Sequence, residues 1–224
     1  MLVHYNPTLK QQVRYAQAFA DASCDITPNP DGDADIHIVQ GPHYALNRWR
    51  HHSRVLWLDR AYWGDPDEVT LGWLQPDGTR KFARGTHKRD RPATLPWKTR
   101  EESCLVLADY RQNVDGIVSE AYKRFGHVSV RRHPVEEKHA LSLETCLTLS
   151  DVCIGNTSTA LIDAIVLGVP VICTDPSSSV ADVSVRGLGD DLYRGGREPW
   201  LHDLSWRQWG IDEIRDGSAL RALL

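Results

Sequence analysis

Four short apolar runs alternate with helical segments between residues 104 and 175, and this alternation limits the possible folds more than any other feature of the chain. The runs CLVLAD, HVSVR, DVCI and PVICTD are predicted strands. The predicted helices between them are residues 113–125, 142–149 and 157–167, and Gly126 and Gly168 follow two of them as end signals. Continuously apolar strands are typical of a sheet covered on both faces, so we predict a β-α-β-α-β-α-β unit with a parallel sheet.

The first 60 residues show a similar order. LVHY, IHIVQ and RVLWLD are predicted strands, a helix is expected from about Asn6 to Ala22, and Gly41-Pro42 begins another. EVTLGWL and TRKFAR flank Pro-Asp-Gly and predict a hairpin, while residues 85–97 predict a linker. From about Leu201 the tail is expected to form two amphipathic helices that carry Trp206 and Trp209.

The predicted fold is therefore α/β, with two small Rossmann-like parallel-sheet halves facing a cleft, a β-hairpin insertion and C-terminal helices. The expected domains are residues 1–96 and 97–224.

Composition narrows the possible partners and compartment. The 224 residues are 41% hydrophobic and carry a net charge of 26 − 30 = −4, so no overall attraction to nucleic acid or anionic membrane is expected. The five cysteines lack C-x-x-C spacing and most lie in apolar runs, which indicates buried thiols in a reducing compartment. No apolar stretch approaches the about 20 residues of a membrane span, and the first residues lack the pattern of a signal peptide. We therefore expect a cytoplasmic protein.

Polar groups follow five predicted strands, at the ends where open α/β sheets bind ligands. They lie at residues 41–43, 59–63, 109–111, 132–134 and 155–159. This convergence indicates a binding site more strongly than any single motif does.

The stretch Gly155-Asn156-Thr157-Ser158-Thr159 begins a predicted helix. Its amides and hydroxyls could hold a phosphate, and Gly155 would allow close approach, although Asn, Ser and Thr are also ordinary helix caps. In RRHP, Arg132 and His133 offer phosphate donors at another strand end, where a solvated basic loop is the alternative.

The two motifs together, RRHP and then SDVCIGNTSTALIDAIVLGVPVI, resemble the nucleotide-binding half of GT-B glycosyltransferases. The most similar branch contains CDP-glycerol glycerophosphotransferases and bacterial polysialyltransferases. The resemblance covers residues 104–175 and implies that His133 and Ser158 hold the donor phosphates, with Thr157 and Thr159 beside them. It extends to the first half only by architecture, and the chain is shorter than is usual for that fold. The tryptophan-rich stretch LSWRQWGIDEIRDG is similar to the ends of small phage-type proteins.

The resemblance implies that the acceptor binds the first half. An inverting enzyme needs a base for the acceptor hydroxyl, and Asp59 is the first candidate, followed by Asp65 and His43. An ion pair with Arg60 or a loop cap is the alternative role of Asp59. Tyr62 and Trp63 could stack on a flat acceptor or pack in the core.

The leading hypothesis is a metal-independent glycosyltransferase that uses a UDP-, GDP- or CDP-linked sugar as co-substrate and has no permanently bound cofactor. The sequence DGDAD precedes a predicted strand and indicates a turn, and the histidines lack zinc-ligand spacing. A hydroxymethyl pyrimidine in DNA is one possible acceptor, because the basic stretch from Arg80 to Arg91 could contact backbone phosphates or could simply be a solvated face. A UDP-sugar 2-epimerase-like enzyme and a non-catalytic nucleotide-binding protein are the alternatives, and the oligomeric state stays open.

Overall fold

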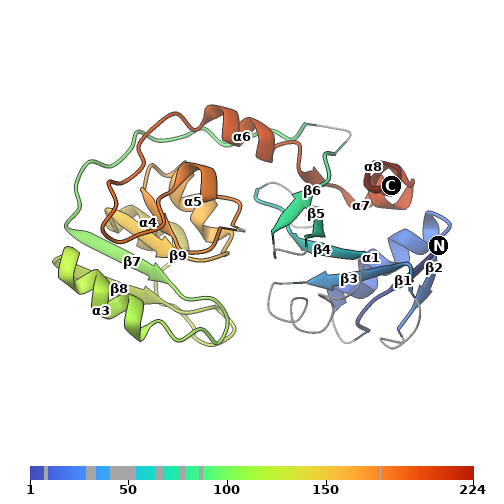
Figure 1. Ribbon diagram of the computed structural model, residues 1–224, viewed down its shortest axis with the longest axis horizontal. Coiled ribbons are helices and arrows are strands. Elements are labelled where there is room, and N and C mark those ends of the chain that lie inside the picture. Colours follow the sequence, from blue (N-terminus) through green and yellow to red (C-terminus); the bar gives the residue numbers. More distant parts are fainter. Residues whose placement is uncertain are drawn as a thin grey trace. The chain divides into compact units, whose positions relative to one another are not determined.

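The computed structural model describes residues 1–7, 10–28, 34–40, 54–63, 68–75, 79–85, 88–176 and 178–224. The chain forms two α/β units (Figure 1). Unit 1 comprises Met1–Arg91 together with Leu201–Leu224, and unit 2 comprises Pro92–Trp200. The predicted α/β class is confirmed, and each unit has its own sheet.

Unit 1 is built on a mixed sheet with the order β11-β5-β4-β3-β1-β2, and β6 pairs with β5. Strands β1 to β4 are parallel, β5 is antiparallel to β4, and β6 and β11 are antiparallel to β5. The elements are β1 (Leu2–His4), α1 (Lys10–Asp21), β2 (Asp25–Thr27), β3 (Ile36–Gln40), β4 (Val55–Arg60), β5 (Val69–Leu74), β6 (Arg80–Phe82), β11 (Gln208–Trp209), α7 (Ile211–Arg215) and α8 (Ser218–Leu223).

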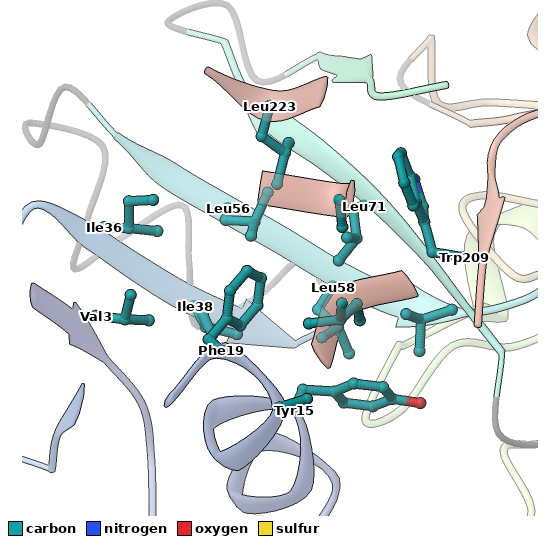
Figure 2. Packing of buried hydrophobic residues seen from close by; sticks show 14 of the residues in the cluster. Val3, Tyr15, Phe19, Ile36, Ile38, Leu56, Leu58, Leu71, Trp209 and Leu223 are labelled. Atoms are coloured by element: carbon teal, nitrogen blue, oxygen red, sulfur yellow. The ribbon is translucent and has the colours of Figure 1, made fainter. Parts of the chain in front are cut away.

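Alternate residues of β4 face opposite sides of this sheet, as the period of a strand requires. On one face Leu56 and Leu58 belong to the main core, with Phe19 from α1, Trp209 from β11 and Leu223 from α8 (Figure 2). On the other face, Val39, Val55 and Trp57 form a smaller cluster. The C-terminal segment therefore contributes directly to the core of unit 1.

Unit 2 is built on a four-stranded sheet with the order β10-β9-β7-β8, and all its strands are parallel. Its elements are β7 (Ser103–Leu107), α3 (Asp115–Arg124), β8 (His127–Arg131), α4 (Leu143–Leu149), β9 (Val152–Gly155), α5 (Ala160–Val166), β10 (Val171–Cys173), the 3₁₀ helix η1 (Ala181–Val183) and α6 (Glu198–Leu204), which continues into unit 1. The predicted order of strands and helices in this half is confirmed.

Helices cover both faces of the sheet of unit 2. Ala121 and Phe125 from the α3 side pack against Val106 and Ile154, while the buried Leu161 and Ile165 belong to α5, which packs against β9 and β10. All five cysteines are free thiols, and Cys24, Cys104, Cys153 and Cys173 are buried. Burial raises the pKa of the Cys104 thiol to about 12, so this thiol is inert at neutral pH.

The predicted linker has no regular secondary structure where it is described, and the two units divide within it, between Arg91 and Pro92. Its end lies along α5, because the amides of Leu95 and Lys98 donate to the carbonyls of Val166 and Gly168. Gly168 has a φ of +75°, and a Cβ there would lie 2.0 Å from the carbonyl oxygen of Pro96. The predicted end signal of the helix is thus confirmed, and the position is restricted to glycine by space as well as by conformation.

Several details differ from the expectation. Trp206 and Trp209 are not on helices: Trp206 lies in a turn and Trp209 lies in β11, where it pairs with Val69. The tail belongs with the first half because the sheet and α1 bury its apolar side chains, whereas the expectation assigned it to residues 97–224. Strand β2 was not predicted, since it is a three-residue edge strand with little apolar content. The helix expected after Gly41-Pro42 and the Pro-Asp-Gly turn lie outside the described residues, although the hairpin strands β5 and β6 are confirmed.

None of the described helices is both long enough and apolar enough to cross a bilayer.

Candidate functional site

The carboxyl ends of the four strands of unit 2 meet at one edge of the sheet, because the strands are parallel and in register. Beyond β7 comes Asp109, beyond β8 come Arg132 and His133, beyond β9 comes Asn156, and beyond β10 comes Thr174. The structure therefore brings the segments of both predicted phosphate-binding motifs to the edge where open parallel sheets bind ligands. We call this the carboxyl edge of unit 2.

The turn after β9 is held by hydrogen bonds within the protein. The amide and the hydroxyl of Thr157 donate to Oδ2 of Asp109, at 3.4 and 3.2 Å. The amide of Ala160 donates to Oγ of Ser158 at 3.3 Å, which leaves the Ser158 hydroxyl proton available as a donor. Helix α5 begins at Ala160, later than the predicted residue 157, because residues 157–159 form this turn instead. The donors that this turn can offer to a ligand are therefore side-chain hydroxyls more than unpaired backbone amides of the helix.

Asn156 and Gly155 have structural roles in this turn. The Thr174 hydroxyl donates to Oδ1 of Asn156, and the Cys173 thiol donates to the Asn156 carbonyl at 3.0 Å, so this residue ties β9 to β10. Gly155 is buried in β9, and a Cβ there would lie 3.0 Å from Cδ2 of Leu161. Packing under α5 is therefore one reason for glycine at this position, and its approach to a phosphate stays a prediction.

His133 is half-buried and is oriented by its own turn. The Val135 amide donates to Nδ1 of His133 at 3.3 Å, while the His133 carbonyl accepts from the amide of Glu136 at 2.8 Å. His139 contacts the Arg132 carbonyl through Nε2 at 2.8 Å and closes the same loop. The Arg132 side chain is exposed to solvent, and it is free of hydrogen bonds and ion pairs to the described residues.

The loop after β7 contacts the loop after β8. The ring of Tyr110 meets the imidazole of His133 edge to face, with centroids 5.7 Å apart. The amide of Arg111 donates to Oε1 of Glu136 at 3.0 Å, and the Arg111 guanidinium lies 5.1 Å from the centroid of the Tyr110 ring. Tyr110 lies in the segment 109–111 that was predicted to reach the site but was not itself named as a site residue, and Glu136 was not predicted. No sequence spacing indicates that the two loops touch. Only the parallel neighbourhood of β7 and β8 could have suggested it.

At the opposite edge of the same sheet, where the strands begin, the carboxylates bind other groups of the protein. Asp151 accepts hydrogen bonds from the amides of Glu102 and Ser103 and from the Ser103 hydroxyl, each at 3.0 Å. Burial acts to raise the pKa of Asp151, but the hydrogen bonds from Ser103 and Glu102 outweigh it and lower the pKa below the usual range. Hydrogen bonds from Arg194 and Arg124 likewise lower the pKa of Glu101. These carboxylates are saturated by the protein and fix the strand starts.

In unit 1, the predicted acceptor residues that are described lie at the end of β4. Asp59 is half-buried within the strand, opposite Thr70, and its Oδ1 accepts from the amide of Arg60 at 2.8 Å. The Arg60 side chain is exposed. His43 and Asp65 lie outside the described residues.

A buried glutamine from the tail fixes the turn after β4. Oε1 of Gln208 accepts from the amides of Tyr62 and Trp63, at 3.0 and 3.3 Å. Tyr62 is only 7% exposed, so it packs in the protein, whereas Trp63 is half-buried with its ring 5.9 Å from that of Tyr62. Of the two rings, Trp63 is the better placed to meet a ligand. Gln208 was not predicted, because it is distant in sequence from the turn that it holds.

Part of the basic stretch from Arg80 to Arg91 is engaged within unit 1. Arg89 forms ion pairs with Glu68 and Glu213, and Arg84 lies over the ring of Trp206, 5.4 Å from its centroid. Lys81 and Lys88 are exposed. Arg89 is therefore a structural residue, and fewer cations than expected are available for nucleic-acid phosphates.

Two further features concern ligands. In the part of the chain that the structure describes, no group of three or more His, Cys, Asp or Glu side chains is arranged to hold a metal ion. A shallow hollow between α4 and α5 contains none of the predicted phosphate-binding residues and is lined by Leu143, Glu144, Asp163, Val166 and Leu167.

Comparison with known proteins gives a likeness of fold. No protein-family model and no curated protein matches the chain. Among solved structures, the chain is similar to the β-Kdo 2,4-transferase of Thermosulfurimonas dismutans KpsC, with a TM-score of 0.50 and 12% identity over 92% of this chain and 90% of that one. The β-Kdo 2,7-transferase of the same KpsC matches with a TM-score of 0.49 and 11% identity over 77% of this chain and 78% of that one. At such identities the likeness concerns the fold alone.

Proposed function

We propose that this protein is a glycosyltransferase that moves a sugar from a nucleotide-linked donor to a hydroxyl group. The observation that carries the proposal is the convergence of Arg132, His133 and the hydroxyls of residues 157–159 at the carboxyl edge of unit 2. The fold shared with a Kdo transferase supports the same class of reaction. The substrate named for that neighbour makes a Kdo donor one of the first to test here.

The donor phosphates would be held by side-chain donors at this edge. The exposed guanidinium of Arg132 offers a planar pair of N–H groups that suits phosphate oxygens. The imidazole of His133 offers Nε2, since the Val135 amide occupies Nδ1, and the Ser158 hydroxyl offers its proton. Such donors stabilise the negative charge that grows on the leaving phosphate as the glycosidic bond breaks.

For the acceptor, we propose that unit 1 binds the hydroxyl compound near the end of β4. Asp59 is the proposed base and would take the hydroxyl proton, while Trp63 would stack on a flat acceptor. His43, Arg60 and Asp65 remain proposed acceptor contacts. A hydroxymethyl pyrimidine in DNA is the acceptor to test for the exposed cations of the basic stretch, such as Lys81 and Lys88.

A thermal-shift and turnover screen of UDP-, GDP- and CDP-linked sugars, with a nucleotide-linked Kdo donor among them, tests the proposal. We expect at least one donor to stabilise the wild-type protein and to release its nucleotide when an acceptor is supplied. His133→Ala and Ser158→Ala should lose both effects.

Matched controls lie elsewhere in unit 2. His127→Ala changes an exposed histidine at the other end of the same strand, and Ser119→Ala changes an exposed serine on α3. Both controls should behave like the wild type. Stabilisation without nucleotide release would indicate a binding protein, and an epimerised sugar nucleotide would indicate an epimerase. The absence of any donor effect on the wild type would overturn the proposal.

A further inference from the structure

We propose that Tyr110 and Glu136 are positioning residues for His133, which they orient with Nδ1 toward the Val135 amide and Nε2 available to donate to a ligand. This inference rests on the proposed function for the identity of the ligand, but its geometric part stands on the contacts between two loops. At the carboxyl edge of unit 2, Tyr110 and Glu136 would therefore orient a ligand-binding side chain without contacting the ligand themselves.

The first step concerns the two nitrogens of His133. A backbone N–H donates to an imidazole nitrogen only when that nitrogen carries no proton, and the Val135 amide donates to Nδ1. The proton of the neutral ring therefore lies on Nε2. In the described part of the chain, this Nε2 has no hydrogen-bond partner, so it is available to donate to a phosphate oxygen.

The second step concerns the orientation of the ring. Because the Val135 contact is a single hydrogen bond of 3.3 Å, it does not by itself prevent the imidazole from rotating. The ring of Tyr110 supplies the second constraint, with an interplanar angle of 68° to the imidazole. Tyr110 is 38% exposed, so burial in a core is not the reason for its position.

The third step explains what holds Tyr110 in place. Its neighbour Arg111 has a φ of 57°, in the left-handed region that residues other than glycine rarely adopt. Such a conformation persists only where the surroundings fix it, and it is found preferentially at functional sites. Here Glu136 fixes it by accepting the Arg111 amide across the two loops. The carboxylate of Glu136 thus acts on His133 through Arg111 and Tyr110.

Nuclear magnetic resonance of the imidazole nitrogens tests this directly in the 224-residue chain without ligand. Long-range ¹H–¹⁵N spectra are recorded at about pH 8.5, where imidazoles are neutral, and the His133 signals are assigned by their loss in His133→Asn. The wild type should show one tautomer with the proton on Nε2. Tyr110→Leu and Glu136→Ala should lose this single tautomer and show a mixture.

Conservative variants separate positioning from general stability. Tyr110→Phe retains the ring and Glu136→Gln retains an acceptor oxygen, so both should keep the wild-type tautomer. Glu120→Gln, which changes an exposed carboxylate on α3, is the control. Backbone amide spectra of β7 to β10 confirm folding, and UDP affinity should fall in Tyr110→Leu and Glu136→Ala, but no further than in His133→Ala.

The tautomer measurement and the nucleotide-binding measurement can fail independently of each other. A wild-type ring with its proton on Nδ1 overturns the inference whatever the variants do. A folded Tyr110→Leu or Glu136→Ala protein that keeps the single wild-type tautomer removes that residue from the role. If UDP does not bind the wild type, the proposed nucleotide site fails, whereas the tautomer result still decides whether the two loops position His133.

Discussion

Single residues at the carboxyl edge of unit 2 divide into those that offer donors and those that orient them. Arg132, His133 and Ser158 present groups to solvent or keep a proton available, while Asp109 holds the Thr157 amide and hydroxyl. The other groups at this edge are cationic or neutral donors, whereas the carboxylate of Asp109 places a negative charge beside the proposed phosphate position.

Most substitutions in the proposed site should weaken nucleotide binding, but a substitution of Asp109 should strengthen it. Asp109→Asn keeps an oxygen for Thr157 but removes a like charge, and two unit charges 4 Å apart interact by about 1 kcal/mol even in water. UDP should therefore bind Asp109→Asn about fivefold more tightly than the wild type at low salt, in isothermal titration. The difference in UDP affinity between Asp109→Asn and the wild type should shrink at high salt, because salt already screens the repulsion between Asp109 and the phosphates in the wild type. Weaker binding at low salt would show that Asp109 serves the site in another way.

Secondary-structure elements are defined by end signals as much as by their apolar faces. Helix α4 is only seven residues long, and it is capped at both ends: Oγ of Ser142 accepts the Thr145 amide at 3.0 Å, and Nζ of Lys98 donates to the carbonyls of Leu147, Thr148 and Ser150. The first cap could be predicted from the sequence. The second could not, because Lys98 is distant in sequence from the helix that it ends.

The cap at Ser142 makes a stability prediction. Ser142→Ala leaves the Thr145 amide without its acceptor, and the loss of such a cap costs about 1 kcal/mol. For a unit of this size the melting temperature should fall by about 4–8 °C in calorimetry. Ser142→Asp restores an acceptor and should melt close to the wild type. Equal melting of Ser142→Ala and the wild type would mean that α4 does not depend on this bond.

Elements with strong local signals were predicted, and elements defined by distant partners were not. The strands and helices of unit 2 follow the apolar periodicity, and Gly168 ends α5 as expected. β11 consists of two residues that form a strand because they pair with β5. This partner is distant in sequence, and the local pattern of the tail predicted a helix instead. In the same way, His133 and Ser158 could be named from motifs, but the contacts of Tyr110, Glu136 and Gln208 become visible only when the chain is folded.

At the scale of the whole molecule, the chain returns to its first unit at the end. Trp209 and Leu223 are buried with Phe19 and Leu56 in the core of unit 1 (Figure 2). Ile214 belongs to the same core, and α7 packs against α1. The N-terminal residues alone therefore do not complete this core.

Removal of the tail tests this dependence. Burial of each large apolar side chain contributes about 1.5–3 kcal/mol, so a chain that ends at Trp200 should lose the cooperative unfolding of unit 1. We expect hydrogen exchange in β1, β3 and β4 to become fast, while β7 to β10 remain protected. Unchanged protection in β4 would show that unit 1 is stable without its C-terminal segment.

The most direct test of the central claim is the footprint of a nucleotide on unit 2. Backbone amide spectra recorded during titration with UDP, and in parallel with CDP, report which residues sense the ligand. We predict that the largest shifts occur at Arg132, His133 and residues 157–159, with little change at Ser103, His127 and Asp151 on the opposite edge. Shifts confined to the opposite edge, or no saturable shifts with either nucleotide, would contradict the account.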